Sequence, residues 1–142
     1  ETVQRPKVNA TSRTPLASGA YLGKLSGDRL QLTVEVDIFM GWHAYDLVPA
    51  NLPYVPLKVS LTLPDGISQV GEWQRPTSHA SIENPGLTIY EGRLELKCEL
   101  AVEKITNPAE VICTISYQVC DERMCLEPMN DRLTVSVSPH VQ

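Results

Sequence analysis

Apolar and polar residues alternate along several stretches of the chain. Every second residue from 30 to 38 is Leu, Val or Ile, and the residues between them are Gln, Thr, Glu and Asp. A period of two predicts a β-strand with one face buried and the other exposed to solvent. The same alternation recurs over residues 57–63, 94–100, 111–117 and 133–137.

Weaker strand signals lie at residues 20–25, 43–46, 68–74 and 87–90. Turn-forming residues such as Ser26-Gly27-Asp28 and Asn84-Pro85-Gly86 separate the strands, and no stretch shows a sustained helical period. Many short strands of this kind predict an all-β fold, an immunoglobulin-like antiparallel β-sandwich. We assign residues 18–142 to this domain, and the polar, proline-containing residues 1–17 to a flexible N-terminal arm.

The length and net charge of the chain exclude several classes of function. The 142 residues suit one domain with its own core. A net charge of −5 argues against a nucleic-acid-binding surface, which needs clustered Lys and Arg. No apolar run approaches the roughly 18 residues needed to cross a bilayer, so we expect no direct membrane insertion of this segment. The motifs of common hydrolases and of P-loop proteins are missing, and we expect no cofactor.

The segment YQVCDERMCLEP, residues 117–128, holds Cys120 and Cys125 with four residues between them, a common hairpin length. Facing residues at a hairpin neck have Cβ atoms about 4.5–5.5 Å apart. A disulfide needs roughly 3.5–4.5 Å, so a bond is reachable with little backbone movement. At a turn, sulfur can meet an external thiolate, which thiol–disulfide exchange requires.

On the residues alone, this pair has other interpretations. It can be a structural disulfide in a non-catalytic immunoglobulin-like binding module. It can also bind Cu(I), because Met124 and Met129 flank Cys125 and add soft sulfur ligands to Cys120. We expect no metal site, since a zinc site would need Cys98 and Cys113, which lie in the middle of predicted strands.

Cys98 and Cys113 fall on the inward faces of their strands. They are either two buried thiols that act as small apolar residues or a cross-strand disulfide, which an oxidising compartment would favour. Neither alternative gives them a catalytic role.

The hairpin segment, GWHAY at 41–45 and IYEGRLELKCEL at 89–100 follow one another as in a known family. From about residue 18 to 138, the chain resembles the N-terminal domains of the DsbD family of bacterial thiol:disulfide interchange proteins. The resemblance implies an immunoglobulin-like domain of an inner-membrane protein, placed in the periplasm, that acts as a protein-disulfide reductase. Its catalytic residues would be Cys120 and Cys125, with Cys125 forming the mixed disulfide and Cys120 resolving it.

The same resemblance implies the partners. The pair would accept electrons from a thioredoxin-like C-terminal domain of the same full-length protein. It would then reduce periplasmic thioredoxin-fold proteins, such as a disulfide isomerase and a cytochrome c maturation thioredoxin. We expect four active-site neighbours: Tyr45, His43, Gln118 and Met124.

The family shields its cysteines with a cap loop, and the matching segment here is about residues 79–87, HASIENPGL. Candidates for the covering side chain are His79, Ile82 and Leu87, and Glu83 is a candidate carboxylate near the pair.

Overall fold

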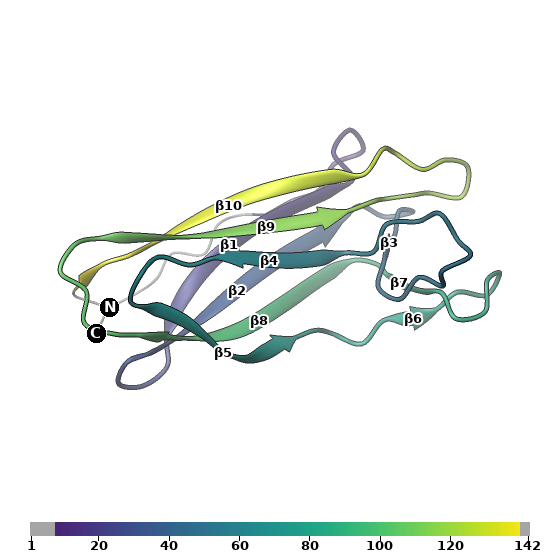
Figure 1. Ribbon diagram of the computed structural model, residues 1–142. Coiled ribbons are helices and arrows are strands. Elements are labelled where there is room, and N and C mark those ends of the chain that lie inside the picture. The colour runs from purple at the N-terminus through teal and green to yellow at the C-terminus, as the bar shows by residue number, and fades with distance from the viewer. Residues whose placement is uncertain (1–7, 140–142) are drawn as a thin grey trace.

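The computed structural model describes residues 8–139 and confirms the predicted all-β sandwich. Figure 1 shows two antiparallel sheets packed face to face. One sheet has the order β1 (Leu16–Lys24), β2 (Arg29–Ile38), β8 (Arg93–Val102) and β5 (Ile67–Gln74). The other has the order β10 (Met129–Val137), β9 (Ala109–Tyr117) and β4 (Lys58–Thr62).

A third, small sheet lies at one end of the sandwich (Figure 1). Its order is β3 (Ala44–Tyr45), β7 (Thr88–Tyr90) and β6 (His79–Ala80). The connection from β9 to β10 is at the same end in Figure 1. No helix in the described part of the chain is long and apolar enough to cross a membrane.

The core follows the alternation of the sequence. On β8, the apolar positions from Leu94 to Leu100 are at most 8% exposed, whereas the residues between them are partly or fully exposed. One apolar cluster, which includes Val34, Leu96 and Ile115, extends to the end with the small sheet, and a second fills the opposite end. Burying one such side chain contributes roughly 1.5–3 kcal/mol, so this core can hold the sandwich together without a crosslink.

Two residues on the predicted polar face of β2 are buried, and the other two are partly exposed. Thr33 and Glu35 are 1% and 6% exposed, because β2 lies between β1 and β8 in the middle of its sheet. The Arg93 guanidinium reaches this face, with Nη1 3.7 Å from Glu35 Oε2. Its Nη2 donates a hydrogen bond to the Val8 carbonyl at 2.6 Å, so a residue of the predicted arm also reaches this face.

The predicted boundary between arm and domain differs from the structure. β1 begins at Leu16 rather than at residue 18, Val8 is only 5% exposed, and the Ala10 amide donates to Asp37 Oδ2 at 2.7 Å. Polar composition suggested a loose segment, but these backbone groups find partners on the sandwich. Residues 1–7 of the predicted arm lie outside the described residues.

Cys98 and Cys113 are free and buried, which supports the interpretation as apolar thiols. They belong to β8 and β9 of the two facing sheets and are not bonded to each other, so the alternative of a cross-strand disulfide is wrong for this structure. Burial raises the pKa of Cys98 to about 11 and that of Cys113 to about 12. Both thiols therefore stay protonated and unreactive in the folded protein.

Candidate redox site at the end of the sandwich

Cys120 and Cys125 are joined in a disulfide within the connection between β9 and β10. Their Cα atoms are 4.0 Å apart, and the two residues form an antiparallel bridge across the hairpin neck. Cys120 is only 2% exposed, whereas Cys125 is an exposed residue. An external thiolate can therefore approach Cys125, while the sandwich covers Cys120.

The turn between the cysteines is held by hydrogen bonds of its own. Asp121 Oδ1 accepts from the backbone amides of Arg123 and Met124, at 2.8 Å each, and the Asp121 amide donates to the Met124 carbonyl at 2.9 Å. These bonds from the backbone N–H groups lower the pKa of Asp121. An aspartate that bonds the amides two and three residues ahead is typical of a stable turn. The turn geometry thus does not depend on the disulfide alone.

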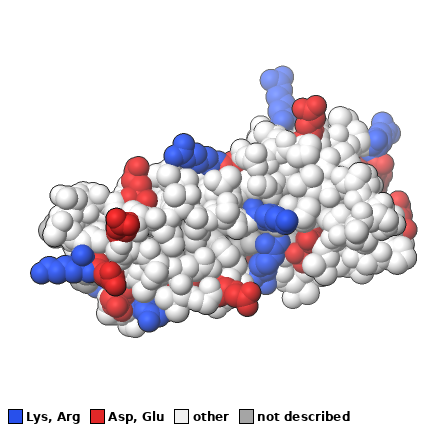
Figure 2. Space-filling model, in the orientation of Figure 1, with Lys and Arg blue, Asp and Glu red and all other residues white. Residues whose placement is uncertain are grey.

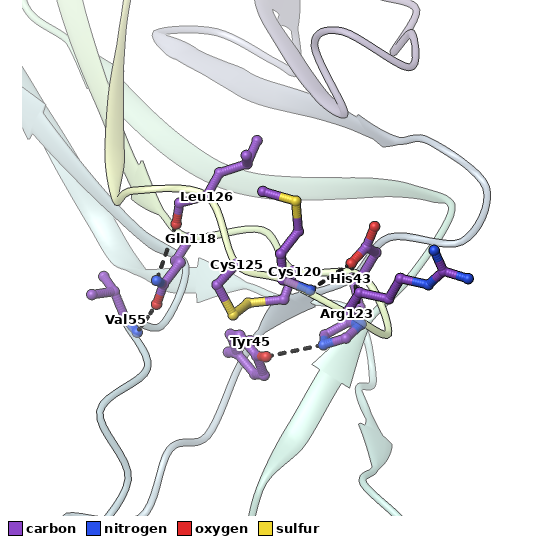
Figure 3. The surroundings of a disulfide bond; sticks show 10 residues. His43, Tyr45, Val55, Gln118, Cys120, Arg123, Cys125 and Leu126 are labelled. Atoms are coloured by element: carbon purple, nitrogen blue, oxygen red, sulfur yellow. Dashed lines mark hydrogen bonds between the residues drawn. A yellow bond between two sulfur atoms is a disulfide. The ribbon is translucent and has the colours of Figure 1, made fainter.

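Gln118 braces the neck of the hairpin, as Figure 3 shows. Its Oε1 accepts from the Val55 amide at 3.1 Å, and its Nε2 donates to the Leu126 carbonyl at 3.1 Å. The Leu126 amide in turn donates to the Val119 carbonyl at 3.0 Å. The residue that follows Cys125 is thereby tied both to the end of β9 and to the loop before β4.

His43 lies directly opposite Cys120. Its amide donates to the Cys120 carbonyl at 2.9 Å, and the Cys120 amide donates to the His43 carbonyl at 3.0 Å. His43 Nε2 lies 3.0 Å from the Tyr45 hydroxyl (Figure 3). Burial lowers the pKa of His43 against the opposing effect of Glu91, Asp121 and Glu83.

Tyr45 forms an apolar wall against the buried cysteine. It is 3% exposed, belongs to one cluster with Leu87 and Cys120, and stacks on Tyr54 with ring centroids 4.5 Å apart. Burial raises the pKa of Tyr45 to about 12, so its hydroxyl stays protonated. The structure thus brings His43, Tyr45 and Gln118 around the pair.

The family profile described as "Thiol:disulfide interchange protein DsbD, N-terminal" matches residues 14–137. The chain belongs to this family. Solved structures of DsbD N-terminal domains share its fold. That of Neisseria meningitidis in the reduced form is 15% identical with a TM-score of 0.52, and covers 85% of this chain and 86% of its own.

Two further structures are similar. The N-terminal periplasmic domain of ScsB from Proteus mirabilis is 16% identical with a TM-score of 0.60, over 90% of this chain and 49% of its own. The complex of the DsbD and PilB N-terminal domains from Neisseria meningitidis is 16% identical with a TM-score of 0.50. The match covers 82% of this chain and 80% of the chain in that complex. A search of curated protein sequences finds no match.

The predicted cap-loop segment, residues 79–87, contains β6 and the turn that leads to β7. Of the three candidates for a covering residue, only Leu87 packs in the cluster with Cys120 and is buried. Ile82 is 101% exposed, and His79 is exposed as well. Glu83 is close enough for its charge to act on His43. Of this segment, only Leu87 is shown to pack in the cluster of the buried cysteine, and Cys125 is exposed.

Two contributors to the site were missed in the sequence. Tyr54 stacks on Tyr45 from the long loop before β4, where no strand pattern marks its position. The turn-forming role of Asp121 had a signal, since Asp at the first position of a short loop commonly bonds the amides ahead of it. Met124, a predicted neighbour, lies in the turn with its side chain 52% exposed.

The described residues contain no group of three or more His, Cys, Asp or Glu side chains that could hold a metal ion. The two cysteines that would bind Cu(I) are joined to each other. A disulfide lacks the thiolates that soft-metal binding requires, so the Cu(I) alternative applies to the reduced protein alone.

Proposed function

We propose that this domain is a thiol–disulfide exchange module of the DsbD system. Its Cys120–Cys125 pair accepts two electrons from a thioredoxin-like domain and passes them to thioredoxin-fold proteins. The observation that carries the proposal is the asymmetry of the pair, with one exposed and one buried cysteine joined across a turn that has its own hydrogen bonds. Exchange needs one accessible sulfur and a second one held ready beside it.

The reaction consists of two displacements at sulfur. The Cys125 thiolate of the reduced domain attacks a disulfide sulfur of the partner, and one partner thiolate leaves. The Cys120 thiolate then attacks Cys125 Sγ, the mixed disulfide breaks, and the second partner sulfur leaves as a thiolate. The partner is reduced by two electrons, and the domain ends with the Cys120–Cys125 disulfide. The same steps in reverse recharge the domain from a reduced thioredoxin-like donor.

Exposed apolar side chains around the pair support a protein substrate. Of the six large apolar side chains exposed in the described part of the chain, five belong to connections or strand starts at the end that carries the pair. The sixth, Leu25, belongs to the β1–β2 connection, which Figure 1 shows at the other end. Apolar side chains gathered in this way are typical of a protein-binding surface. We define this apolar rim as Met40, Leu47, Ile82, Met124 and Met129.

The relatives support the partner class and the compartment. A DsbD N-terminal domain forms a complex with the PilB N-terminal domain, and the ScsB relative is a periplasmic domain. By analogy, we place this domain in the periplasm, as part of an inner-membrane protein whose own thioredoxin-like C-terminal domain supplies the electrons. Its clients would be a disulfide isomerase and a cytochrome c maturation thioredoxin.

Transfer to an oxidised thioredoxin-fold protein tests the proposal. The reduced domain should reduce a periplasmic disulfide isomerase, and Cys120→Ser should accumulate a mixed disulfide through Cys125. Cys125→Ser should form none. Cys98→Ala is the matched control, because Cys98 is buried and free, and it should transfer electrons like the wild type. If Cys125→Ser reduces the isomerase as fast as the wild type, the disulfide is only structural and the proposal is wrong.

A further inference from the structure

We infer that His43 takes up the proton of the Cys120 thiol when Cys120 resolves the mixed disulfide, and returns it when the disulfide is opened. This inference rests on the proposed function and assigns a chemical role to a residue outside the cysteine pair. It follows from the position of His43, from the burial of Cys120 and from the charges around the imidazole.

The position comes from the backbone. Two reciprocal hydrogen bonds make His43 and Cys120 a directly opposed antiparallel pair. Side chains of such a pair point to the same face, with Cβ atoms about 4.5–5.5 Å apart. Cys120 is bridged on its other side to Cys125, so the three residues follow one another across three segments, an order that Figure 3 also shows. The pairing therefore puts the side chains of His43 and Cys120 on one face as cross-strand neighbours, within reach of a proton transfer once the disulfide is open.

The burial of Cys120 creates the need for a base. The attacking species in exchange is the thiolate, and burial disfavours the charged form of a thiol. With Cys120 2% exposed, solvent hydroxide has little access to its sulfur. Cys125 has no such need, because it is exposed and can lose its proton to solvent. A base beside Cys120 thus speeds the second displacement and leaves the first unchanged.

The surroundings of His43 favour the uptake of a proton. The Tyr45 hydroxyl can accept a hydrogen bond from Nε2–H, since the two atoms are 3.0 Å apart. In that tautomer, Nδ1 keeps a free lone pair for the incoming proton. The resting imidazole is neutral because burial lowers its pKa. The imidazolium that forms is stabilised by negative charges from three loops: Glu91, Asp121 and Glu83.

The step balances without another reactant. The Cys120 S–H proton moves to His43, the thiolate attacks Cys125 Sγ, and the bond between Cys125 and the partner sulfur breaks. The partner sulfur leaves with the electron pair and takes a proton from solvent, and the imidazolium releases its proton to solvent. In the reverse direction, the imidazolium protonates Cys120 as it leaves.

A pH jump isolates this step. The reduced domain is mixed with one equivalent of 2,2′-dipyridyl disulfide at about pH 4, where both protein thiols are protonated. This reagent reacts with thiols in acid, so it labels the accessible Cys125 and releases one thiopyridone. A jump to higher pH starts the attack by Cys120, and stopped-flow absorbance follows the second thiopyridone.

In the wild type, the rate of the second thiopyridone release should be nearly independent of pH between about pH 7 and 9, because the imidazole is already neutral there. In His43→Gln it should be about 10²-fold slower at neutral pH, the usual minimum effect of losing a general base. It should then rise roughly tenfold per pH unit, because hydroxide must remove the proton instead. His79→Gln is the matched control, since His79 is exposed on β6, and it should keep the wild-type profile.

The outcomes are distinct. A His43→Gln profile equal to that of the wild type overturns the inference, even if the rate is slightly changed. A wild type that never releases the second thiopyridone contradicts the proposed function itself, because Cys120 then does not resolve the adduct. If His43→Gln does not regain the native disulfide after reoxidation, His43→Asn replaces it in the same assay.

Discussion

Reduction of the Cys120–Cys125 disulfide should leave the sandwich folded and lower its free energy of unfolding by about 2.2 kcal/mol. The bond links residues five apart and closes a loop of six residues. The chain-entropy relation for a loop of this size gives that value at 25 °C. It is modest because a short loop has little conformational freedom to lose.

The structure explains why the fold should survive. Cys125 belongs to none of the buried clusters, and of the residues in the β9–β10 connection only Val119 and Leu126 reach the large clusters of the sandwich. The turn keeps the Asp121 bonds, the Gln118 brace and the pairing of His43 with Cys120. A reduced form that stays folded is also what a domain that cycles between two redox states needs.

Urea unfolding of the oxidised and reduced protein measures this difference. With a slope of about 2 kcal/mol/M, the midpoint should move by roughly 1 M urea. In the double variant Cys120→Ser/Cys125→Ser, reductant should have no effect, which controls for the two buried thiols. A loss above about 4 kcal/mol, or unfolding on reduction, would refute this reasoning and favour a structural disulfide.

Three further predictions concern residues outside the disulfide. Gln118→Ala removes two hydrogen bonds and should lower the free energy of unfolding by about 1–3 kcal/mol in urea. Gln118→Glu should lose at least as much, because its carboxylate can accept from the Val55 amide but turns a second acceptor toward the Leu126 carbonyl. Cys113→Ser places a hydroxyl in an apolar core and should cost about 1–3 kcal/mol in urea unfolding. Its rate of electron transfer to a disulfide isomerase should match that of the wild type. A much slower transfer would show that Cys113 takes part in the reaction, which contradicts its assignment as a buried, unreactive thiol. The pKa of His43 lies below its ordinary value of 6.5 in the folded state, so the unfolded chain binds the proton more tightly. The free energy of unfolding should therefore fall as pH drops below 6.5, and His43→Gln should show a smaller fall in the same titration; equal falls would contradict this assignment.

Local patterns in the sequence were enough to predict the strands of the two large sheets, but not the two-residue strand β6. The alternation on β8 and β9 reflects a face that is buried along its whole length, so burial follows the printed letters closely. The sequence also predicted that Cys120 and Cys125 can form a disulfide with little backbone movement, because the two residues are close in the chain. These features depend on neighbours in sequence, which a single chain displays directly.

Features that depend on distant segments were not predictable in the same way. Glu35 looks like a solvent-facing residue of an alternating strand, and only the central place of β2 and the arrival of Arg93 bury it. The family resemblance placed residues 41–45 near the pair, but it did not predict the pairing of His43 with Cys120.

The distribution of surface charge was not predictable either. Figure 2 shows that acidic and basic side chains are interspersed on one face of the domain. Net charge alone does not reveal how charges are distributed over a surface.

The central claim is that Cys125 is the sulfur through which this domain exchanges electrons. The most direct measurement treats the oxidised wild-type protein with limiting reduced glutathione, quenches the mixture in acid and locates the adduct by mass spectrometry of its peptides. We predict glutathione on Cys125, because Cys120 is 2% exposed and Cys125 is open to solvent. An adduct found mainly on Cys120 would contradict the account.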